Sequence, residues 1–404
     1  MKKDTSLEII YLDHNATTAT RPEVVEAMAA YLREGMGNPA SQHRIGNRAR
    51  RVLEECREAI ASILGADVTA SPPDRVIFTS GGTEANNLAI LGISRARARQ
   101  GPPPRPGKPD QIIISGLEHA SVLEAAEQLL EDGWRLDTVG ATPEGVIRLD
   151  QLEAFLTPET RLVSVMLANH ETGVIQPVEQ VVRICQRQDV PVHTDAVQAI
   201  GKIPVHFRRL GVAAMSLAAH KFQGPPGIGA LICRADVPIL PILYGGHQQE
   251  GLRPGTEPVA LVVGMRTALE LWQKEAAEEA RRLTLLRQRF EGSLRKALPG
   301  IVVHGEDAPR LPQTSSIAFP GFDAQMLLLA LDRAGVMCSI GSACSSGTAE
   351  PSPTLRAMGL PKELVSASLR FSFGATTTEA EIDEAVRRII AVVENLKTHK
   401  VRTK

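Results

Sequence analysis

The chain has 404 residues, of which 43% are hydrophobic, and its 45 Lys and Arg residues against 46 Asp and Glu residues give a formal net charge of −1. This length and apolar content allow a large core and two or three domains. The balanced charge and an aromatic content of 3% argue against nucleic acid and anionic membranes as partners.

No targeting or membrane-anchoring segment is predicted. No apolar block follows the two N-terminal lysines, so we expect no secretory signal, and no apolar run reaches the length of a membrane span. No two of the five cysteines have C-x-x-C spacing; they are Cys56, Cys185, Cys233, Cys338 and Cys344. This sparse, odd set is typical of free thiols in a reducing compartment, so we expect a cytoplasmic protein without a structural metal site.

The N-terminal part of the chain alternates extended and helical patterns. Residues 11–18 (YLDHNATT) predict a short strand that runs into a polar turn. Apolar spacing predicts one helix over 22–34, with proline in its first turn, and a second over 44–64, which ends at Gly65.

A strand, a Gly-rich turn and a helix then follow one another without a gap. The β-type run 75–79 (RVIFT) leads into SGGTEANN and an apolar helical stretch over 88–93. In this order, backbone amides and a helix N-terminus can hold a phosphate, although an ordinary tight turn is the alternative. Thr83 is either a hydroxyl ligand of that phosphate or the N-cap of the helix.

The middle of the chain alternates strands and helices after a Pro-rich connector at 101–109. Strands are predicted at 111–115, 161–167, 190–193 and 212–217, with a helix at 178–188. This alternation predicts an α/β fold with a mostly parallel central sheet and helices on both faces. Sites in such sheets lie at the carboxyl ends of the strands. The residues that follow strands here are Gly81 to Thr83, His119, Asn169 to Glu171, Asp195 and Lys221.

Lys221 stands at the end of an apolar strand, in SLAAHKFQGPPGIG. Desolvation lowers the pKa of an amine, so such a lysine can be partly neutral and can form a Schiff base with an aldehyde cofactor. The alternative is a lysine whose stem is buried and whose charged end reaches water.

Asp195, in HTDAVQ, is a candidate partner for that lysine. A strand-end aspartate can cap the next helix, or it can pair with a pyridinium nitrogen and keep the ring protonated. A Schiff-base lysine and a pyridinium partner are the two groups that a pyridoxal phosphate enzyme needs. His119 either stacks on the ring or is an ordinary buried histidine.

The C-terminal part changes to an α+β pattern. Residues 257–298 are predicted to be largely helical and to lead into short strands at 301–304, 315–319 and 369–373 and helices at 324–334 and 378–396. We predict two domains. Residues 16–260 form a large cofactor-binding α/β domain, and residues 1–15 with 261–404 form a small α+β domain that carries the Cys344 loop.

Nine motifs in order resemble those of the cysteine desulfurases that supply sulfur for iron–sulfur clusters, within the class-V aminotransferase family of pyridoxal phosphate enzymes. The motifs are YLDHNATT, GNPASQH, FTSGGTEANN, EHASV, HTDAVQAIGK, AHKFQGPPGIG, GLRPGTE, GSACSS and SLRFSFG. They span nearly the whole chain. The resemblance implies the aminotransferase fold of type I.

The resemblance also implies roles for matching residues. Lys221 would bind the cofactor aldehyde, His119 would stack on the ring, Asp195 would bind the pyridine nitrogen and Gln198 the ring hydroxyl. The phosphate would be held by Thr83, the amides around Gly82, and His220, with Thr256 reaching the phosphate of the partner subunit in a homodimer.

On the substrate side, Arg370 would clamp the carboxylate of L-cysteine through its planar guanidinium, beside Asn169 and His170. A surface arginine on a strand is the alternative for Arg370. Cys344, in a loop of small residues, resembles the catalytic cysteine, which takes sulfur from L-cysteine to give alanine and a persulfide and passes the sulfur to an acceptor protein. Cys338 is better explained by packing.

Three positions depart from the family pattern: His170 replaces the second asparagine of a pair, Ala218 replaces a phosphate-binding serine, and Pro226 replaces a frequent lysine. The first two affect positions near the cofactor and motivate an alternative, a non-catalytic scaffold that kept the fold. A selenocysteine lyase on the same scaffold is a further alternative. A scaffold has no need of Lys221, Asp195, Arg370 and Cys344 together, so we favour an enzyme.

Overall fold

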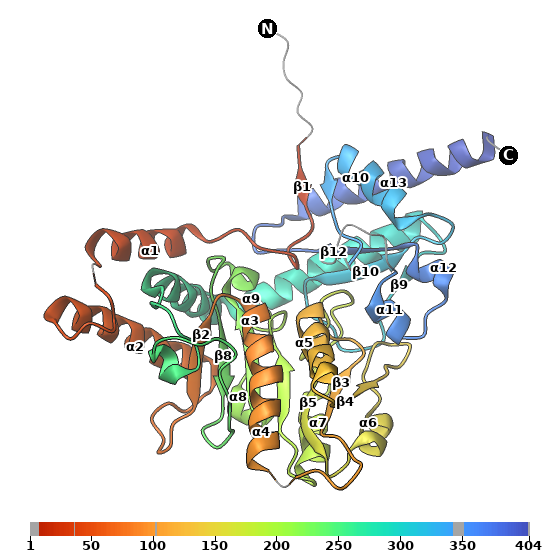
Figure 1. Cartoon of the computed structure of the whole chain (residues 1–404). Coiled ribbons are helices and arrows are strands. Elements are labelled where there is room, and N and C mark those ends of the chain that lie inside the picture. Colours follow the sequence, from red (N-terminus) through yellow and green to blue (C-terminus); the bar gives the residue numbers. More distant parts are fainter. Residues whose placement is uncertain (1–7, 36, 102, 342–350, 403–404) are drawn as a thin grey trace.

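A seven-stranded sheet forms the centre of the larger part of the molecule (Figure 1). The computed structural model describes residues 8–35, 37–101, 103–341 and 351–402, with only the backbone described for 399–402. The strand order is β2-β8-β7-β6-β5-β3-β4, and only β8 runs antiparallel to its neighbours. The strands are β2 (Arg75–Thr79), β3 (Gln111–Ser115), β4 (Arg135–Val139), β5 (Thr160–Ser164), β6 (Val192–Asp195), β7 (Ala214–Ala218) and β8 (Gly229–Cys233).

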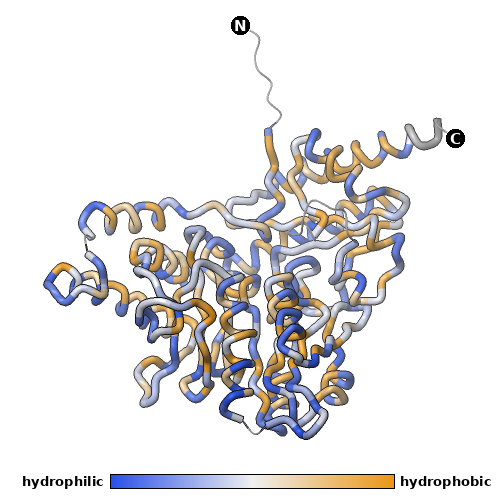
Figure 2. Tube along the Cα trace, viewed as in Figure 1, coloured by the Kyte–Doolittle hydropathy of each residue, from blue (hydrophilic) through white to orange (hydrophobic). Residues whose placement is uncertain are grey.

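Alternate residues of these strands enter two separate cores, because successive side chains of a strand point to opposite faces. Val76 and Phe78 belong to one apolar cluster, whereas Ile77 between them belongs to another. Figure 2 shows the same apolar concentration along the strands. Both faces of the sheet are therefore buried, as the α/β prediction requires, and the predicted fold class is confirmed.

Helices cover these two faces. They are α1 (Pro22–Glu34), α2 (Arg44–Leu64), α3 (Gly82–Asn87), the π-helix η1 (Leu88–Ile93), α4 (Ser94–Gln100), α5 (Ala120–Glu131), α6 (Leu149–Phe155), α7 (Val178–Gln186) and α8 (Phe207–Leu210). The predicted bounds of α1 and α2 are confirmed. Helix α2 ends at Gly65, whose φ of 71° is the left-handed conformation that glycine adopts without strain.

The smaller part contains a three-stranded antiparallel sheet, β12-β10-β9, and a two-stranded parallel pair of β1 with β11. Its apolar core includes Phe290, Phe319, Phe371 and Phe373. Its elements are β1 (Ile10–Tyr11), β9 (Val302–Val303), β10 (Thr314–Ala318), α10 (Ala324–Arg333), β11 (Val336–Met337), α11 (Pro353–Ala357), α12 (Lys362–Val365), β12 (Ser368–Ser372) and α13 (Glu379–Arg402).

Helix α9 (Val259–Ala297) runs between the two parts (Figure 1). Val262, Met265 and Leu269 on its first half pack in a core of the large sheet, whereas Leu286 and Phe290 on its second half pack in the core of the smaller part. The division after residue 260 stays a prediction, and α9 is shared by both cores. No helix in the described part of the chain is long and apolar enough to cross a membrane.

Candidate cofactor site

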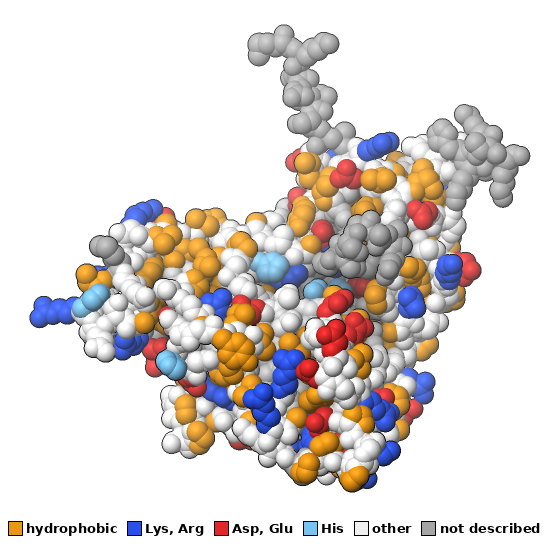
Figure 3. Space-filling model, viewed as in Figure 1, with side chains coloured by type: hydrophobic (Ala, Val, Ile, Leu, Met, Phe, Trp, Pro, Cys, Tyr) orange, Lys and Arg blue, Asp and Glu red, His pale blue; other side chains and the backbone are white. Residues whose placement is uncertain are grey.

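A cavity of about 400 Å³ lies at the carboxyl ends of the parallel strands. Histidine side chains gather near the middle of the face seen in Figure 3. The residues that line the cavity are Ala16, Gly82, Thr83, Asn86, His119, Ser121, Met166, Ala168, His170, Asp195, Val197, Gln198, Ala218, His220 and Lys221. The structure thus brings eight of the predicted site residues together: Gly82, Thr83, His119, His170, Asp195, Gln198, His220 and Lys221.

Lys221 lies in a single 3-10 turn, η2 (Ala219–Phe222), directly after β7. Its Nζ donates to the backbone carbonyls of Asn15, at 2.7 Å, and Ala16, at 2.9 Å. The amine is therefore held by the N-terminal segment in the wall of the cavity, and its charged end does not simply extend into bulk water.

The predicted phosphate end is built by the turn between β2 and α3. Gly81 occupies the N-cap position of α3 and no side chain caps the helix, so the alternative of Thr83 as N-cap is wrong. Thr83 is exposed and lines the cavity. A Cβ on Gly82 would lie 2.9 Å from Cγ2 of Val197, so glycine is needed for this close approach of the chain.

His220 lies beside Lys221 at the same cavity. Burial, with the charge of Lys221 adding to it, lowers the pKa of His220 to about 4, and its Nδ1 is 3.1 Å from Oγ1 of Thr17. The ring is therefore neutral near pH 7 and offers a hydrogen bond rather than a charge. Ala218, the last residue of β7, also lines the cavity and offers no side-chain hydrogen bond.

Asp195 is the last residue of β6 and is buried. Its Oδ1 accepts from the backbone N–H of Val197 at 2.9 Å, and its Oδ2 accepts from Nδ2 of Asn86 at 2.7 Å. The first bond caps the turn that follows β6, and the carboxylate lines the cavity as well. Gln198 donates from Nε2 to the carbonyl of Asn15 at 3.0 Å.

His119 is the N-cap of α5, where its Nδ1 accepts from the backbone N–H of Ser121 at 3.1 Å. Its ring meets that of His170 edge to face, with centroids 5.6 Å apart. Burial lowers the pKa of His170 well below its usual range, and the neighbouring His119, Arg370 and Lys221 add to this effect. His170 is therefore neutral, and its buried Nδ1 has no hydrogen-bond partner within the described residues.

Two predicted substrate residues do not line the cavity. Arg370 is buried; its Nη2 pairs with Oδ1 of Asp13 at 2.7 Å and its Nη1 donates to the carbonyl of His170 at 3.2 Å. The alternative of a surface arginine is therefore wrong. Asn169 uses its Oδ1 to accept from the backbone N–H groups of Glu171 and Thr172, which shapes the turn. A substrate role for either residue stays a prediction.

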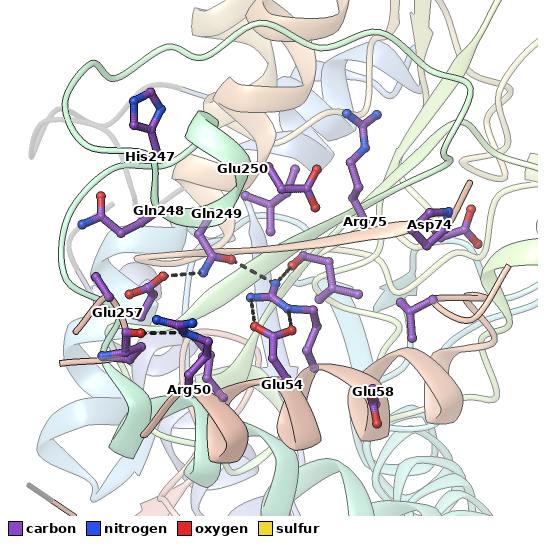
Figure 4. A pocket seen from close by; sticks show the side chains of 18 residues that line it. Arg50, Glu54, Glu58, Asp74, Arg75, His247, Gln248, Gln249, Glu250 and Glu257 are labelled. Carbon is purple, nitrogen blue, oxygen red and sulfur yellow. Dashed lines mark hydrogen bonds and ion pairs between the residues drawn. The ribbon is translucent and has the colours of Figure 1, made fainter. Parts of the chain in front are cut away.

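Thr256 is exposed and lies outside the cavity. It follows a segment that lines a second cavity, of about 490 Å³, against α2 (Figure 4). There Gln249 accepts from Nη1 of Arg57 at 3.0 Å and donates to Oε1 of Glu257 at 3.3 Å. This cavity contains none of the predicted site residues.

The predicted catalytic Cys344 lies outside the described residues. Cys338 is partly buried against the core of the smaller part, which confirms that it serves packing. The other described cysteines, Cys56, Cys185 and Cys233, are buried free thiols. Among the described residues, no group of three or more His, Cys, Asp or Glu side chains could hold a metal ion.

The cavity has the donor set that pyridoxal phosphate requires. It combines an amine, a buried carboxylate, a glycine turn at a helix start and an imidazole ring, all from segments that follow strands. The unpartnered Nδ1 of His170 and Oδ1 of Asn86 are buried polar atoms that a ligand can satisfy.

Comparisons with known proteins point the same way. Residues 10–385 match the aminotransferase class-V family. The cysteine desulfurase IscS of Dictyoglomus turgidum is 40% identical over 389 residues, which are 96% of this chain and 95% of that protein. The chain belongs to the cysteine desulfurases of the class-V aminotransferase family.

Solved structures of this family share its fold. A NifS-like protein is 34% identical, with a TM-score of 0.85, and the match covers 96% of this chain and 99% of that one. A structure of SspA in complex with cysteine is 29% identical, with a TM-score of 0.76, and covers 90% and 98%. Cysteine desulfurases of class V use pyridoxal 5′-phosphate, so the predicted family, enzyme class and cofactor are confirmed.

Sequence reasoning missed several groups at this desulfurase site: the carbonyls of Asn15 and Ala16 that hold Lys221, and the side chains of Asn86 and Ser121. Asn86 lies in the quoted motif FTSGGTEANN, so its position pointed to the site. No local pattern marks a backbone carbonyl that receives a bond from a lysine 206 residues away.

Proposed function

We propose that this desulfurase converts L-cysteine to L-alanine and leaves the sulfur as a persulfide on Cys344. The observation that carries the proposal is the convergence of Lys221, Asp195 and His119 on one cavity. A scaffold without activity has no use for an amine, a buried carboxylate and a proton-carrying ring in one place.

The cofactor, when bound, supplies an aldehyde carbon that takes up an amine and a ring that accepts electrons from the bonds being broken. Lys221 would hold it, because its Nζ is already fixed by two carbonyls in the cavity wall. Asp195 would keep the ring nitrogen protonated, and Gln198, Thr83, Gly82 and His220 would hold the ring hydroxyl and the phosphate.

The sulfur step balances without a further reactant. The Cys344 thiolate attacks the substrate sulfur, the carbon–sulfur bond breaks, and a proton returns to the carbon, so cysteine and an enzyme thiol give alanine and an enzyme persulfide. His119, which lines the cavity, would move protons there. Arg370, beside the carbonyl of His170, would bind the substrate carboxylate, and neutral His170 would face it as a hydrogen-bonding group.

The sulfur acceptor, the cellular location and the oligomeric state are part of the same proposal. The persulfide would pass to a sulfur-acceptor protein of iron–sulfur cluster assembly in the cytoplasm. Thr256 supports a homodimer, because it is exposed here and would reach a phosphate only in a second copy of the chain. A fully active monomer in sedimentation measurements contradicts that assignment.

The deciding experiment compares three variants of the purified enzyme with wild type. Lys221→Ala is expected to abolish the visible absorption band of the lysine-bound cofactor. Cys344→Ser should keep the band, since Lys221 and Asp195 are unchanged. Its rate of alanine formation should fall at least about 100-fold, and persulfide labelling should be lost. Cys338→Ser is the matched control and should keep activity, because Cys338 packs in the smaller part.

Two outcomes contradict the proposal. A wild-type protein without a visible band would show that Lys221 carries no cofactor. Near-normal release of sulfide by Cys344→Ser without added thiol would mean that Cys344 does not accept the sulfur. Faster release of alanine from selenocysteine than from cysteine would then favour a selenocysteine lyase.

A further inference from the structure

We propose that Ser121 and Asn86 form one hydrogen-bonded unit that fixes the ring proton of His119 on Nε2 and orients the side chain of Asp195. Both are positioning residues for the proposed desulfurase reaction, on which this inference rests. Neither residue was singled out by the sequence, yet both line the cavity, and their hydrogen bonds connect His119 to Asp195.

The first step concerns His119. Its Nδ1 lies 3.1 Å from the backbone nitrogen of Ser121 and 2.9 Å from Oγ of the same residue. A backbone N–H can only donate, so Nδ1 must present its lone pair. The proton of a neutral His119 ring is therefore on Nε2, and protonation at Nδ1 would break the contact that caps α5.

The second step gives the direction of the other bonds. Ser121 Oγ accepts from Nδ2 of Asn86 at 2.8 Å, so its single hydrogen is available for Nδ1 of His119. The second hydrogen of the Asn86 amide goes to Oδ2 of Asp195 at 2.7 Å. The opposite orientation of the amide would place its oxygen against the carboxylate, so this orientation is chemically required.

Burial makes these bonds consequential. Asn86 is 1% exposed, and Ser121 and Asp195 are each 7% exposed, so water does not replace a lost partner easily. The Asn86 amide is shared by Ser121 and Asp195, and its own Oδ1 has no partner among the described residues. The buried Oδ1 therefore carries a desolvation cost, while both hydrogens of the same amide bind groups of the site.

The unit predicts two separable effects. With Asn86 present, Asp195 accepts one hydrogen bond on each oxygen, from Val197 and from Asn86, which fixes the orientation of the side chain that would face the ring nitrogen. The Ser121 hydroxyl adds a second donor to the backbone N–H at Nδ1 of His119, so both contacts leave Nε2 as the nitrogen that exchanges protons, and the ring is held at two points. Losing Asn86 disturbs both effects, whereas losing Ser121 disturbs only the second directly.

The test is a double-mutant cycle on the cofactor-loaded enzyme with Asn86→Ala, Ser121→Ala and the double variant. Asn86→Ala is expected to raise the dissociation constant of pyridoxal phosphate about tenfold. Ser121→Ala should lower kcat about tenfold with little change in KM, and Ser121→Thr, which keeps the hydroxyl, should restore kcat. In the double variant, kcat should fall no further than in the more severe single variant, because one unit is broken in either case.

The control is Asn87→Ala. Asn87 is the next amide on the same helix and donates to backbone carbonyls of Thr83 and Ser121, not to His119 or Asp195. The kcat of Asn87→Ala and its dissociation constant for pyridoxal phosphate should stay within about twofold of the wild-type values. In protein with ¹⁵N-labelled histidine, the ring signals assigned to His119 by loss in His119→Asn should report protonated Nε2 in wild type, and the Nδ1 signal should shift in Ser121→Ala, where Nδ1 loses the hydroxyl donor and keeps the backbone N–H.

The proposal is overturned if the effects of the two single variants on kcat simply add, or if folded Asn86→Ala keeps the wild-type dissociation constant. A protonated Nδ1 in the wild-type spectrum has the same consequence. In each of these cases wild type keeps its visible band and its cysteine turnover, so failure here is distinct from failure of the proposed function, in which wild type itself lacks the band or the activity.

Discussion

Glu118, the neighbour of His119, is a carboxyl group that the fold keeps protonated. Its Oε1 accepts from Oγ of Ser115 at 2.6 Å and from the backbone N–H of Met166 at 2.7 Å, whereas its buried Oε2 has no partner within the described residues. Burial, with the charge of Asp195 adding to it, raises the pKa of Glu118 to about 8.

This shift predicts a pH dependence of stability at the scale of one residue. Between the usual pKa of about 4.5 and about 8, the folded chain binds a proton that the unfolded chain has released, so this contribution to stability falls as pH rises. Its slope is at most about 1.4 kcal/mol per pH unit. Glu118→Gln removes the titration. Urea unfolding midpoints measured at pH 5, 6, 7 and 8 should therefore show the midpoint of the variant increasing relative to that of wild type as pH rises. Parallel curves would contradict the assignment.

At the scale of the element, α9 stabilises two cores with one helix, and its buried residues should matter far more than its exposed ones. Phe290 is fully buried and packs against the rings of Phe371 and Phe373, with centroids 5.0 and 5.3 Å away. Phe290→Ala is expected to cost about 3–5 kcal/mol of stability, since it removes an aromatic ring and leaves a cavity.

Leu285 is the matched control for that prediction. It lies on the same helix with 53% of its side chain exposed, so Leu285→Ala should change stability by no more than about 0.5 kcal/mol. Urea unfolding followed by circular dichroism measures both variants. Equal losses would mean that α9 is not anchored in the smaller part through its apolar face.

At the scale of the whole molecule, neutral histidines are distributed through both parts of the chain. Burial lowers the pKa of His14, His220 and His304 to about 4 and that of His193 to about 3. Below pH 6.5 the histidines bind protons in the unfolded chain but not in the folded chain. The stability that their neutral forms contribute is complete above pH 6.5 and is lost as pH falls towards 4.

His14, His193 and His304 each contribute a slope of up to about 1.4 kcal/mol per pH unit, the partly exposed His220 contributes less, and together they outweigh the opposite slope of Glu118. The unfolding midpoint in urea should therefore drop steeply between pH 6.5 and 4.5. His304→Asn should reduce the drop, because His304 bonds through Nε2 to Oγ of Ser368, at 2.8 Å, a contact that an amide can replace. A flat profile over this range would show that these rings take up protons in the folded chain.

The sequence by itself determined the fold class, the family and most of the cavity. Parallel strands end at one edge of a sheet, so residues that follow predicted strands had to meet, as Gly82, His119, Asp195 and Lys221 do. Periodicity also fixed α1 and α2, because apolar spacing records which face of a helix is buried. The exact ends of β5 and β6 were missed by up to three residues, since pairing register is set by neighbouring strands.

Only the tertiary structure decided how the site is held. The carbonyls of Asn15 and Ala16 receive Lys221, and Asp13 pairs with Arg370 across 357 residues of chain. Asn169 keeps the first asparagine of the family's pair, yet its side chain shapes its own turn. The physical reason is that a local pattern records burial and backbone conformation, whereas the partner of a polar group depends on which distant segments the folded chain brings within hydrogen-bond distance.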